Sequence, residues 1–421
     1  MRTVSDRNAT MARRIAAAVA QAGGRTYYVG GCVRDQLLGL ENKDIDIEVH
    51  GVTVPALSAI LDRLGERTVM GASFGIMGLR HYDIDIAMPR SEKATGRGHK
   101  DFEVFVDPFI GEEKAAMRRD FTMNALMRDV LTGEVLDFFG GRADLAVGRI
   151  RHVSDASFAE DPLRVFRAAQ FAARFGFSVA DETTALCATM AVDALPPERV
   201  MGELEKALIK AARPSIFFDA LKRMGQLRPW FAELDALTGA AWERVMAVLD
   251  AAAALRSEAT QPLGFMMAAS CAGFEPATAG GFLARLTHAV ELTRYVLNMV
   301  QRRGDLEGYL AADPGEAGCM ALFDGALCPE DLILLSRAAH AGAAGWSGTE
   351  RRLRGLYALY RARMDRPFVM GRDLISAGVK PGPDMGRALA YAHSLRLAGA
   401  DKAEQLQGTL EWLESGEDGH A

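Results

Sequence analysis

The pattern of apolar residues changes near Asp155, and this change constrains the fold more than any other feature of the sequence. Before it, short runs in which apolar and polar residues alternate, at 44–49, 76–80 and 82–87, predict β-strands between helical segments. After it, apolar residues recur at helical spacing and strand-like alternation almost vanishes. We therefore expect an α+β protein, with a mixed sheet and helices at the N-terminus and an all-helical remainder.

Breaks in the helical pattern divide the chain into four predicted segments. They are a sheet-containing head (1–153), a helical neck (154–235), a helical body (236–366) and a helical tail (367–421). Within the head, the glycine-containing, charged stretch 91–100 predicts a mobile loop. Within the body, the apolar spacing at 282–299 predicts one continuous helix.

Composition excludes several classes of protein. The chain has 421 residues, of which 49% are apolar, and its longest apolar stretch, 263–274, is too short to span a membrane. Its five cysteines show no CxxC spacing, which argues against a disulfide framework and a thiolate metal site. We expect a reducing, cytoplasmic location and no membrane partner, and the sequence leaves the oligomeric state open.

The net charge of −6 means that any contact with nucleic acid must come from a local patch. One candidate is a run of arginines interleaved with leucine and tyrosine. It comprises Arg351, Arg352, Arg354, Arg361, Arg363 and Arg366. An amphipathic helix with a solvated basic face would show the same pattern.

A double glycine marks a candidate phosphate site. Gly30 and Gly31 follow a predicted strand, and a helix that contains Arg34 begins directly afterwards. Glycines let the backbone approach a phosphate, and a helix N-terminus offers unpaired N–H groups and the positive end of its dipole. Arg34, in the first helical turn, can add a bidentate phosphate contact. A plain strand–helix connection has the same signature, so this turn alone decides nothing.

Two runs of alternating acidic and apolar residues predict a site for divalent cations. Asp44 and Asp46 would point to one face of a strand while the isoleucines beside them point to the core. Two such carboxylates, about 7 Å apart, can bracket a pair of Mg²⁺ ions about 3.5–4 Å from each other. A third carboxylate would come from Asp85 rather than Asp83, which lies at the start of the next run. An exposed strand face with alternating charge would have a similar sequence.

Together these two motifs resemble the signature of the polymerase-β-like nucleotidyltransferases, and more narrowly that of bacterial tRNA nucleotidyltransferases (CCA-adding enzymes) and poly(A) polymerases. The stretches 118–125, 160–167 and 198–206 resemble that family's ribose-recognition motif, its base-recognition helix and the neck segment that braces this helix. The resemblance covers roughly the first 230 residues. It implies a polymerase-β-like head, two Mg²⁺ ions held by Asp44, Asp46 and Asp85, and tRNA, ATP and CTP as partners.

The resemblance assigns nucleotide binding to residues of these stretches. Asp120 and Asn124 are four residues apart, so they would share one face of a helical turn. A carboxylate and an amide there can form hydrogen bonds with ribose hydroxyls. The resemblance also implies that Arg119 contacts a phosphate. From the residues alone, Asp120 could equally be a helix N-cap.

Asp161 and Arg164 are the predicted readers of the base, because three-residue spacing places them on one helical face. A carboxylate accepts from the exocyclic amino group that cytosine and adenine share, and a guanidinium donates to the neighbouring ring nitrogen. Uracil and guanine would leave both side chains unpaired, at a cost of about 1–3 kcal/mol per group. In the family, Arg167 supports this pair. The acids and proline at 160–162 also form an ordinary helix start.

The motifs and the resemblance together predict a Mg²⁺-dependent enzyme that adds CMP and AMP to the tRNA 3′ end without a template. Poly(A) polymerases and CC-only or A-only enzymes share the head motifs and remain alternatives, with a non-catalytic RNA-binding module as a third. Many relatives carry an HD metal domain after the neck, but no histidine here is followed by aspartate. We therefore expect no phosphodiesterase or phosphatase activity, and expect His288, His340 and His393 to be ordinary helical residues.

Overall fold

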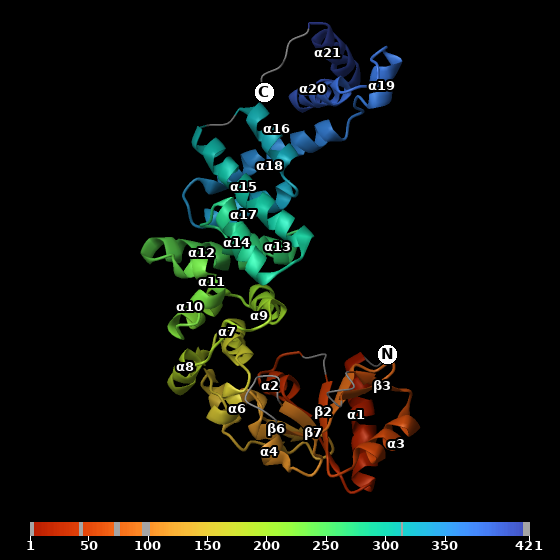
Figure 1. Ribbon diagram of the computed structural model, residues 1–421, viewed down its shortest axis with the longest axis vertical. Coiled ribbons are helices and arrows are strands. Elements are labelled where there is room, and N and C mark those ends of the chain that lie inside the picture. Colours follow the sequence, from red (N-terminus) through yellow and green to blue (C-terminus); the bar gives the residue numbers. More distant parts are fainter. Residues whose placement is uncertain (1–3, 42–44, 71–75, 95–101, 313–314, 416–421) are drawn as a thin grey trace. The chain divides into compact units, whose positions relative to one another are not determined.

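The computed structural model describes residues 4–41, 45–70, 76–94, 102–312 and 315–415 of the chain, with the elements labelled in Figure 1. Packing divides the chain into two compact units. The first comprises Met1–Ala207 and Ile216–Trp230, and the second comprises Leu208–Ser215 and Phe231–Ala421. Most of the predicted head and neck therefore lies in one unit. The four-segment division stays a prediction.

A seven-stranded mixed sheet with the strand order β3-β4-β5-β2-β1-β8-β9 forms the first unit's centre. Its strands are β1 (Arg25–Val29), β2 (Ile45–His50), β3 (Arg67–Met70), β4 (Ile76–Leu79), β5 (Ile84–Ala87), β8 (Met127–Asp129) and β9 (Val135–Leu136). β2 and β5 run parallel, whereas β1 pairs antiparallel with both β2 and β8. This confirms the mixed sheet predicted for the head.

Side chains alternate between the two faces of β2. Ile45 and Ile47 are buried on one face. Asp46 and Glu48 lie on the other face, which Tyr27 of β1 shares because it opposes Glu48 in the antiparallel pair. Tyr27 belongs to a buried cluster with Val29, Ala116, Ala125 and Met127. The face of β2 that carries its acidic residues therefore lies on the side of the sheet where Tyr27 packs against Ala116, Ala125 and Met127.

Helices complete the first unit. α1 (Val4–Gln21) contacts α3 (Val54–Leu64) and the strands β1 and β2. The further helices up to residue 235 are α2 (Gly31–Leu37), α4 (Glu112–Met117), the 3₁₀ turn η1 (Thr122–Asn124), α5 (Gly141–Ala146), α6 (Asp155–Ala159), α7 (Leu163–Phe175), α8 (Asp181–Ala188), α9 (Pro197–Lys210), α10 (Ser215–Arg223) and α11 (Arg228–Asp235). Two short strands, β10 (Arg149–Ile150) and β11 (Ser178–Val179), pair in parallel.

Helix α7 places the predicted base-recognition residues. Its apolar residues recur at helical spacing and nine of its residues are buried, including Val165 and Phe166. The helix ends at Phe175 because Gly176 adopts a left-handed conformation with φ 69°. Arg164 and Arg167 are three residues apart in this helix, so their side chains project from nearly the same side of it.

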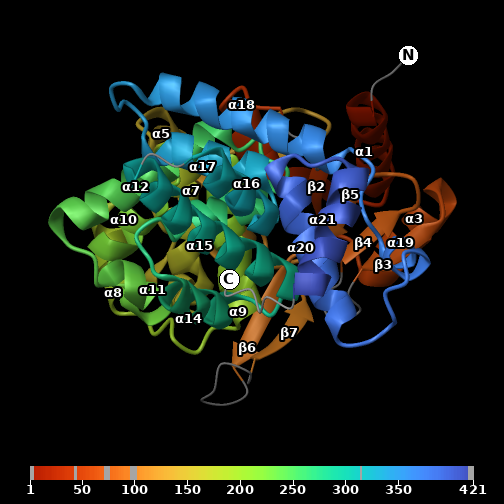
Figure 2. The same cartoon turned by 90° about the horizontal axis from the view of Figure 1, so that it is seen from above.

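A two-stranded ribbon corrects one prediction. β6 (Arg90–Ala94) pairs antiparallel with β7 (Phe102–Val106), and the two strands lie side by side in Figure 2. The prediction of a loop over 91–100 was therefore wrong for 91–94, and residues 95–100 lie outside the described part of the chain. Composition indicated a loop because residues 90–94 are mostly polar and charged and show no apolar alternation typical of a strand.

In its described residues, the second unit contains helices and no strand, as the sequence predicts. These helices are α12 (Gly239–Leu255), α13 (Pro262–Ser270), α14 (Pro276–Leu286), α15 (Val290–Ala312), α16 (Glu316–Gly325), α17 (Pro329–Ala339), α18 (Trp346–Met364), α19 (Gly371–Ser376), α20 (Asp384–Ala398) and α21 (Lys402–Ser415). Within the described ranges, no helix has both the length and the apolar character needed to cross a bilayer.

The helix predicted at 282–299 is in fact two helices. Thr287 is extended, with φ −152° and ψ 150°, and separates α14 from α15. His288 therefore lies in a connection rather than a helix, contrary to expectation. Apolar periodicity continues across the break because both helices bury their apolar faces in the same unit, so the pattern alone concealed it. His340 is the C-terminal cap of α17, and His393 lies within α20.

Candidate functional site

The double-glycine turn joins β1 to α2. Gly30 has φ 67° and ψ −134°, a conformation that side chains disfavour. A Cβ atom on Gly30 would lie 3.1 Å from the Nη1 atom of Arg119. Glycine is therefore required here both for backbone conformation and for the close approach of a guanidinium. The turn brings a guanidinium close to the backbone at the start of α2, which is an arrangement suited to phosphate oxygens.

Two predicted acids lie on neighbouring strands. Asp46 of β2 is the in-register partner of Asp85 of β5, and parallel strands lie about 4.8 Å apart. Asp83 precedes β5, and its backbone N–H donates to Asn8 at 3.4 Å. The register therefore favours Asp85 over Asp83 as the partner of Asp46. Tyr28 of β1 opposes Ile47 of β2, and helix α2, which begins at Gly31, contacts β2, so Asp46 lies close to the glycine turn.

The acid pair fits a divalent cation in its chemistry. Two carboxylates side by side repel each other, and hard oxygen donors favour Mg²⁺ over thiophilic metals. Asp44, the other predicted ligand, lies outside the described residues. Among the residues that the structure describes, no group of three or more His, Cys, Asp or Glu side chains could hold a metal ion. The metal-ligand assignment of Asp44, Asp46 and Asp85 stays a prediction.

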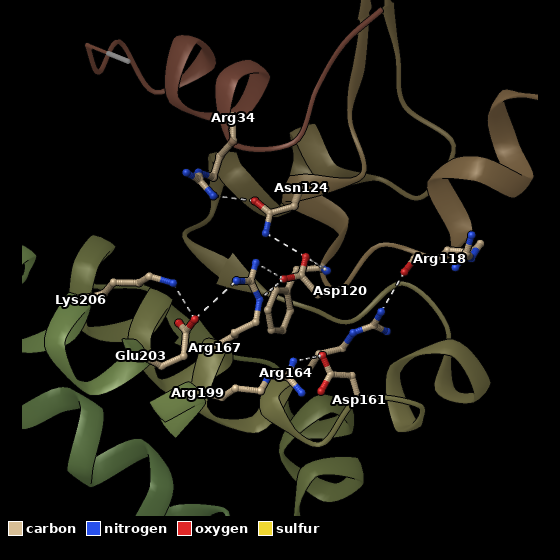
Figure 3. Close-up of polar contacts among 11 residues, drawn as sticks. Arg34, Arg118, Asp120, Asn124, Asp161, Arg164, Arg167, Arg199, Glu203 and Lys206 are labelled. Atoms are coloured by element: carbon tan, nitrogen blue, oxygen red, sulfur yellow. Dashed lines mark hydrogen bonds and ion pairs between the residues drawn. The ribbon is translucent and has the colours of Figure 1, made fainter. Parts of the chain in front are cut away.

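Arg34 is buried, and its guanidinium has partners within the protein. It donates to Asp35 Oδ1 at 2.7 Å. It also donates to Asn124 Oδ1 at 2.6 Å (Figure 3). Its Cζ atom also lies about 5 Å from the ring centroids of Phe171 and Phe175. Burial lowers the pKa of Arg34. These contacts tie the start of α2 to η1, and the predicted phosphate contact of Arg34 is not tested by them.

Asp120 and Asn124 meet, but not on an α-helix as predicted. Helix α4 ends at Met117, and the turn η1 is of the 3₁₀ type. Asn124 Nδ2 nevertheless donates to Asp120 Oδ1 at 2.9 Å. The same oxygen accepts the backbone N–H of Phe121 at 2.8 Å, so Asp120, which precedes η1, fixes the entry to this 3₁₀ turn rather than capping an α-helix.

Arg167 pairs with Asp120 and not with the predicted base readers. Its Nε donates to Asp120 Oδ2 at 2.7 Å, and its Nη1 lies 3.7 Å from Glu203 Oε1 (Figure 3). Burial alone would raise the pKa of Asp120, but the charge of Arg167 and the hydrogen bonds from Asn124 and Arg167 hold it below its usual range. Glu203 of α9 also accepts from Lys206 at 2.8 Å. The head and the neck helix are thus joined by a chain of alternating charges.

Asp161 and Arg164 lie at the start of α7, each held by other parts of the unit. Asp161 Oδ1 accepts the N–H of Leu163 at 3.1 Å, and Oδ2 accepts from Arg199 of α9 at 2.9 Å. Arg164 donates to the carbonyls of Ser157 at 2.6 Å and Arg118 at 2.9 Å. The structure brings these two side chains into the same region as Asp120 (Figure 3). Their role as base readers stays a prediction.

A comparison with known families identifies the domain that holds this site. Residues 26–151 match the family model of the poly A polymerase head domain. This part of the chain is therefore similar to that head domain. The matched residues include β1, β2, β5 and η1, and therefore the glycine turn and the acid pair.

Curated relatives match about half of the chain. The multifunctional CCA protein of Thioalkalivibrio sulfidiphilus (strain HL-EbGR7) is 45% identical over 222 residues, which are 51% of this chain and 52% of the relative. That of Cupriavidus taiwanensis is 41% identical over 252 residues, 55% of this chain and 59% of the relative. The chain spans about half the length of the curated relatives it matches.

Solved structures match almost the whole chain. The Thermotoga maritima CCA-adding enzyme complexed with tRNA has a TM-score of 0.69 at 23% identity, covering 96% of this chain and 95% of that one. The Bacillus stearothermophilus CCA-adding enzyme in complex with CTP has a TM-score of 0.73 at 21% identity, covering 99% of both chains. These likenesses show that head and helical remainder together have the fold of those proteins, which confirms the predicted α+β class.

Glu48 is a residue of the head domain that the sequence analysis missed. It continues the alternation of Asp44 and Asp46 by one more step, is buried, and lies 3.2 Å from Arg119. Burial alone would raise the pKa of Glu48, but hydrogen bonds from His50 and Arg119 and the charge of Arg119 hold it below its usual value. The periodicity of the acidic run was the available signal. It did not distinguish a third functional acid from an ordinary charged strand position.

The arginines of the predicted basic patch lie on α18, except for Arg366, which lies just after its end. Several of them have acidic partners. Arg354 donates to Glu350 at 2.7 Å, and Arg363 pairs with Glu316. The contacts of Arg354 and Arg363 partly neutralise the patch, and its predicted contact with RNA remains untested.

Two of the histidines have partners within the second unit. His340 stacks on Trp346 with ring centroids 4.1 Å apart, and His393 Nε2 lies 2.9 Å from Asp324 Oδ1.

Proposed function

We propose that this protein adds CMP and AMP to the 3′ end of tRNA without a template, using CTP and ATP and releasing pyrophosphate. The observation that carries the proposal is the in-register pairing of Asp46 with Asp85, close to the Gly30 turn. The names of the curated relatives and the solved structures with tRNA, ATP and CTP support this choice of substrates.

We further propose that the metal is Mg²⁺, held by Asp46, Asp85 and Asp44. Two adjacent carboxylates of the first unit supply hard oxygen ligands and a local excess of negative charge. When bound, Mg²⁺ supplies charge neutralisation of the triphosphate and a lower pKa for the attacking RNA hydroxyl. The protein's own contribution is to hold the two carboxylates in register beside the phosphate-binding turn.

The remaining residues position the nucleotide. The Gly30 backbone and Arg119 would hold the triphosphate, while Asp120 and Asn124 face the ribose. Asp161 and Arg164 would read the base edge. The carbonyls of Ser157 and Arg118 fix the orientation of the Arg164 guanidinium plane. A guanidinium has five N–H donors, and these two contacts leave some of the five for a base. A fixed guanidinium is a better discriminator than a mobile one because less entropy is lost when it binds.

Poly(A) polymerase activity is the second candidate, because the matched family is described by that name. The net charge of −6 disfavours it, since sequence-independent binding of RNA depends on contacts to the phosphate backbone. CC-only and A-only tRNA enzymes would use the same head residues.

The decisive experiment uses tRNAs that end at the discriminator base, at C or at CC, each incubated with Mg²⁺ and one nucleoside triphosphate. We expect CTP to extend the first two substrates and ATP only the third, with no extension by UTP or GTP. Long tails made from ATP on unstructured RNA would replace this proposal with poly(A) synthesis. Absence of incorporation with either Mg²⁺ or Mn²⁺ would leave an RNA-binding role.

A further inference from the structure

Glu48 lies between two basic side chains of the head domain. Its Oε2 atom is 3.2 Å from Arg119 Nη2, and its Oε1 atom is 2.9 Å from His50 Nε2. Glu48 is 8% exposed and His50 is 4% exposed, so these two side chains meet away from bulk water, whereas the side chain of Arg119 is 23% exposed. Each carboxylate oxygen of Glu48 therefore has its own partner.

The far side of His50 is also fixed. The Tyr27 ring packs edge-on against the His50 ring, with centroids 5.4 Å apart and an angle of 90° between the rings. The Tyr27 hydroxyl donates to Glu112 of α4 at 2.8 Å. Because Tyr27 also opposes Glu48 across the β1–β2 pair, Glu48 and His50 are held both by the sheet register and by packing.

Arg119 connects this buried group to the glycine turn. Its Nη2 atom faces Glu48, while its Nη1 atom lies 3.1 Å from where a Cβ atom of Gly30 would be. Arg119 is followed directly by Asp120, which pairs in the other direction with Arg167. Two adjacent residues thus anchor opposite sides of the site, one to the strand and the other to the neck.

We propose that Glu48 is a positioning residue, which holds the Arg119 guanidinium against the Gly30 turn so that it meets the triphosphate already oriented. This rests on the proposed function only for the identity of the triphosphate. An arginine held by a buried carboxylate loses little rotamer entropy on binding an anion, whereas an unheld side chain would lose about 1 kcal/mol or more. Glu48 keeps Arg119 rather than competing with the anion, because a guanidinium can face a carboxylate with one edge and a phosphate with another.

The test compares equilibrium binding of CTP with binding of tRNA. Glu48→Ala should weaken CTP binding by about tenfold, the size of one charge-assisted hydrogen bond, and leave tRNA binding within about twofold. Glu48→Gln, which keeps the shape and one acceptor oxygen for Arg119, should retain more of the affinity than Glu48→Ala. In steady state, Glu48→Ala should raise KM for CTP more than it lowers kcat. The matched control is Glu66→Gln, at a surface pair with Arg80, which should change neither ligand.

A second comparison separates positioning from a merely structural role. In an Arg119→Met background, Glu48→Ala should produce no further loss of CTP affinity, because the residue it positions is gone. Equal further loss in that background, unchanged affinity of the single variant, or tighter CTP binding by Glu48→Gln would each overturn the proposal. Binding is measured without turnover, so coupling between Glu48 and Arg119 would stand even if nucleotide addition to tRNA were not observed.

Discussion

The first unit contains two pairs of side chains that differ in charge: one pair has two negative charges, and the other has one negative and one positive charge. Asp46 and Asp85 are like charges held side by side by strand register, whereas Asp120 meets the guanidinium of Arg167 at 2.7 Å. The first arrangement favours a cation from outside the chain, and the second is neutralised within it. The strand pair is therefore the part of the proposed site that needs a metal ion, whereas the Asp120–Arg167 pair joins the segment before η1 to helix α7.

The largest expected effect is the loss of activity when the Asp46–Asp85 pair is disrupted. Asp46→Ala should lower nucleotide incorporation by about a thousandfold or more, because metal stabilisation of transition-state charge is worth several kcal/mol. The same variant should bind tRNA normally, and its free energy of unfolding in metal-free buffer should change by less than about 1 kcal/mol. Incorporation assays and urea unfolding measure the two quantities. Retained activity would remove Asp46 from the site.

Disrupting the Asp120–Arg167 pair should affect stability first. Arg167→Ala leaves the buried Asp120 carboxylate without its cation, and we expect a loss of about 3 kcal/mol in the free energy of unfolding. Arg199→Ala, which removes a more exposed pair with Asp161, should cost less than about 1 kcal/mol. Urea unfolding of the two variants side by side tests this difference. Equal costs would mean that the Asp120 pair is no more important to folding than a surface contact.

Selectivity should depend on Arg164. Arg164→Ala should reduce discrimination against UTP and GTP by about tenfold to a hundredfold, the equivalent of one unpaired polar group, before turnover is lost completely. Competition between CTP and UTP on a tRNA lacking CCA measures it. A variant that still chose C and A as strictly as the native protein would contradict the assignment.

The smallest expected effect is on the pH dependence of the free energy of unfolding. The folded-state pKa of Asp120 is held below its usual value, so this carboxylate contributes stability above about pH 4 that is lost as pH falls through the folded pKa. Asp120→Asn should therefore be less stable than the native protein at pH 7, and the difference should shrink below about pH 4. Unfolding free energies measured from pH 7 to pH 3 would show it. A difference that stayed constant across this range would mean that Asp120 is not ionised in the folded state.

Elements marked by apolar periodicity were predictable, and those without it were not. The alternating runs at 44–49, 76–80 and 82–87 correspond to β2, β4 and β5. The ribbon of β6 and β7 was missed because residues 90–94 are mostly polar and show no apolar alternation. The break at Thr287 was missed because both neighbouring helices bury apolar faces at the same spacing.

The sequence by itself determined the fold class and placed Asp46, Asp85, Asp161 and Arg164 among the candidate residues, because strand alternation, helix spacing and motif order are local properties. Only the tertiary structure decided which charges meet. It aligned Asp46 with Asp85 through the parallel register, directed Arg167 to Asp120, and placed Glu48 behind Arg119. Those contacts join residues from different elements, and electrostatic interactions depend on distance in space, which spacing along the chain does not specify.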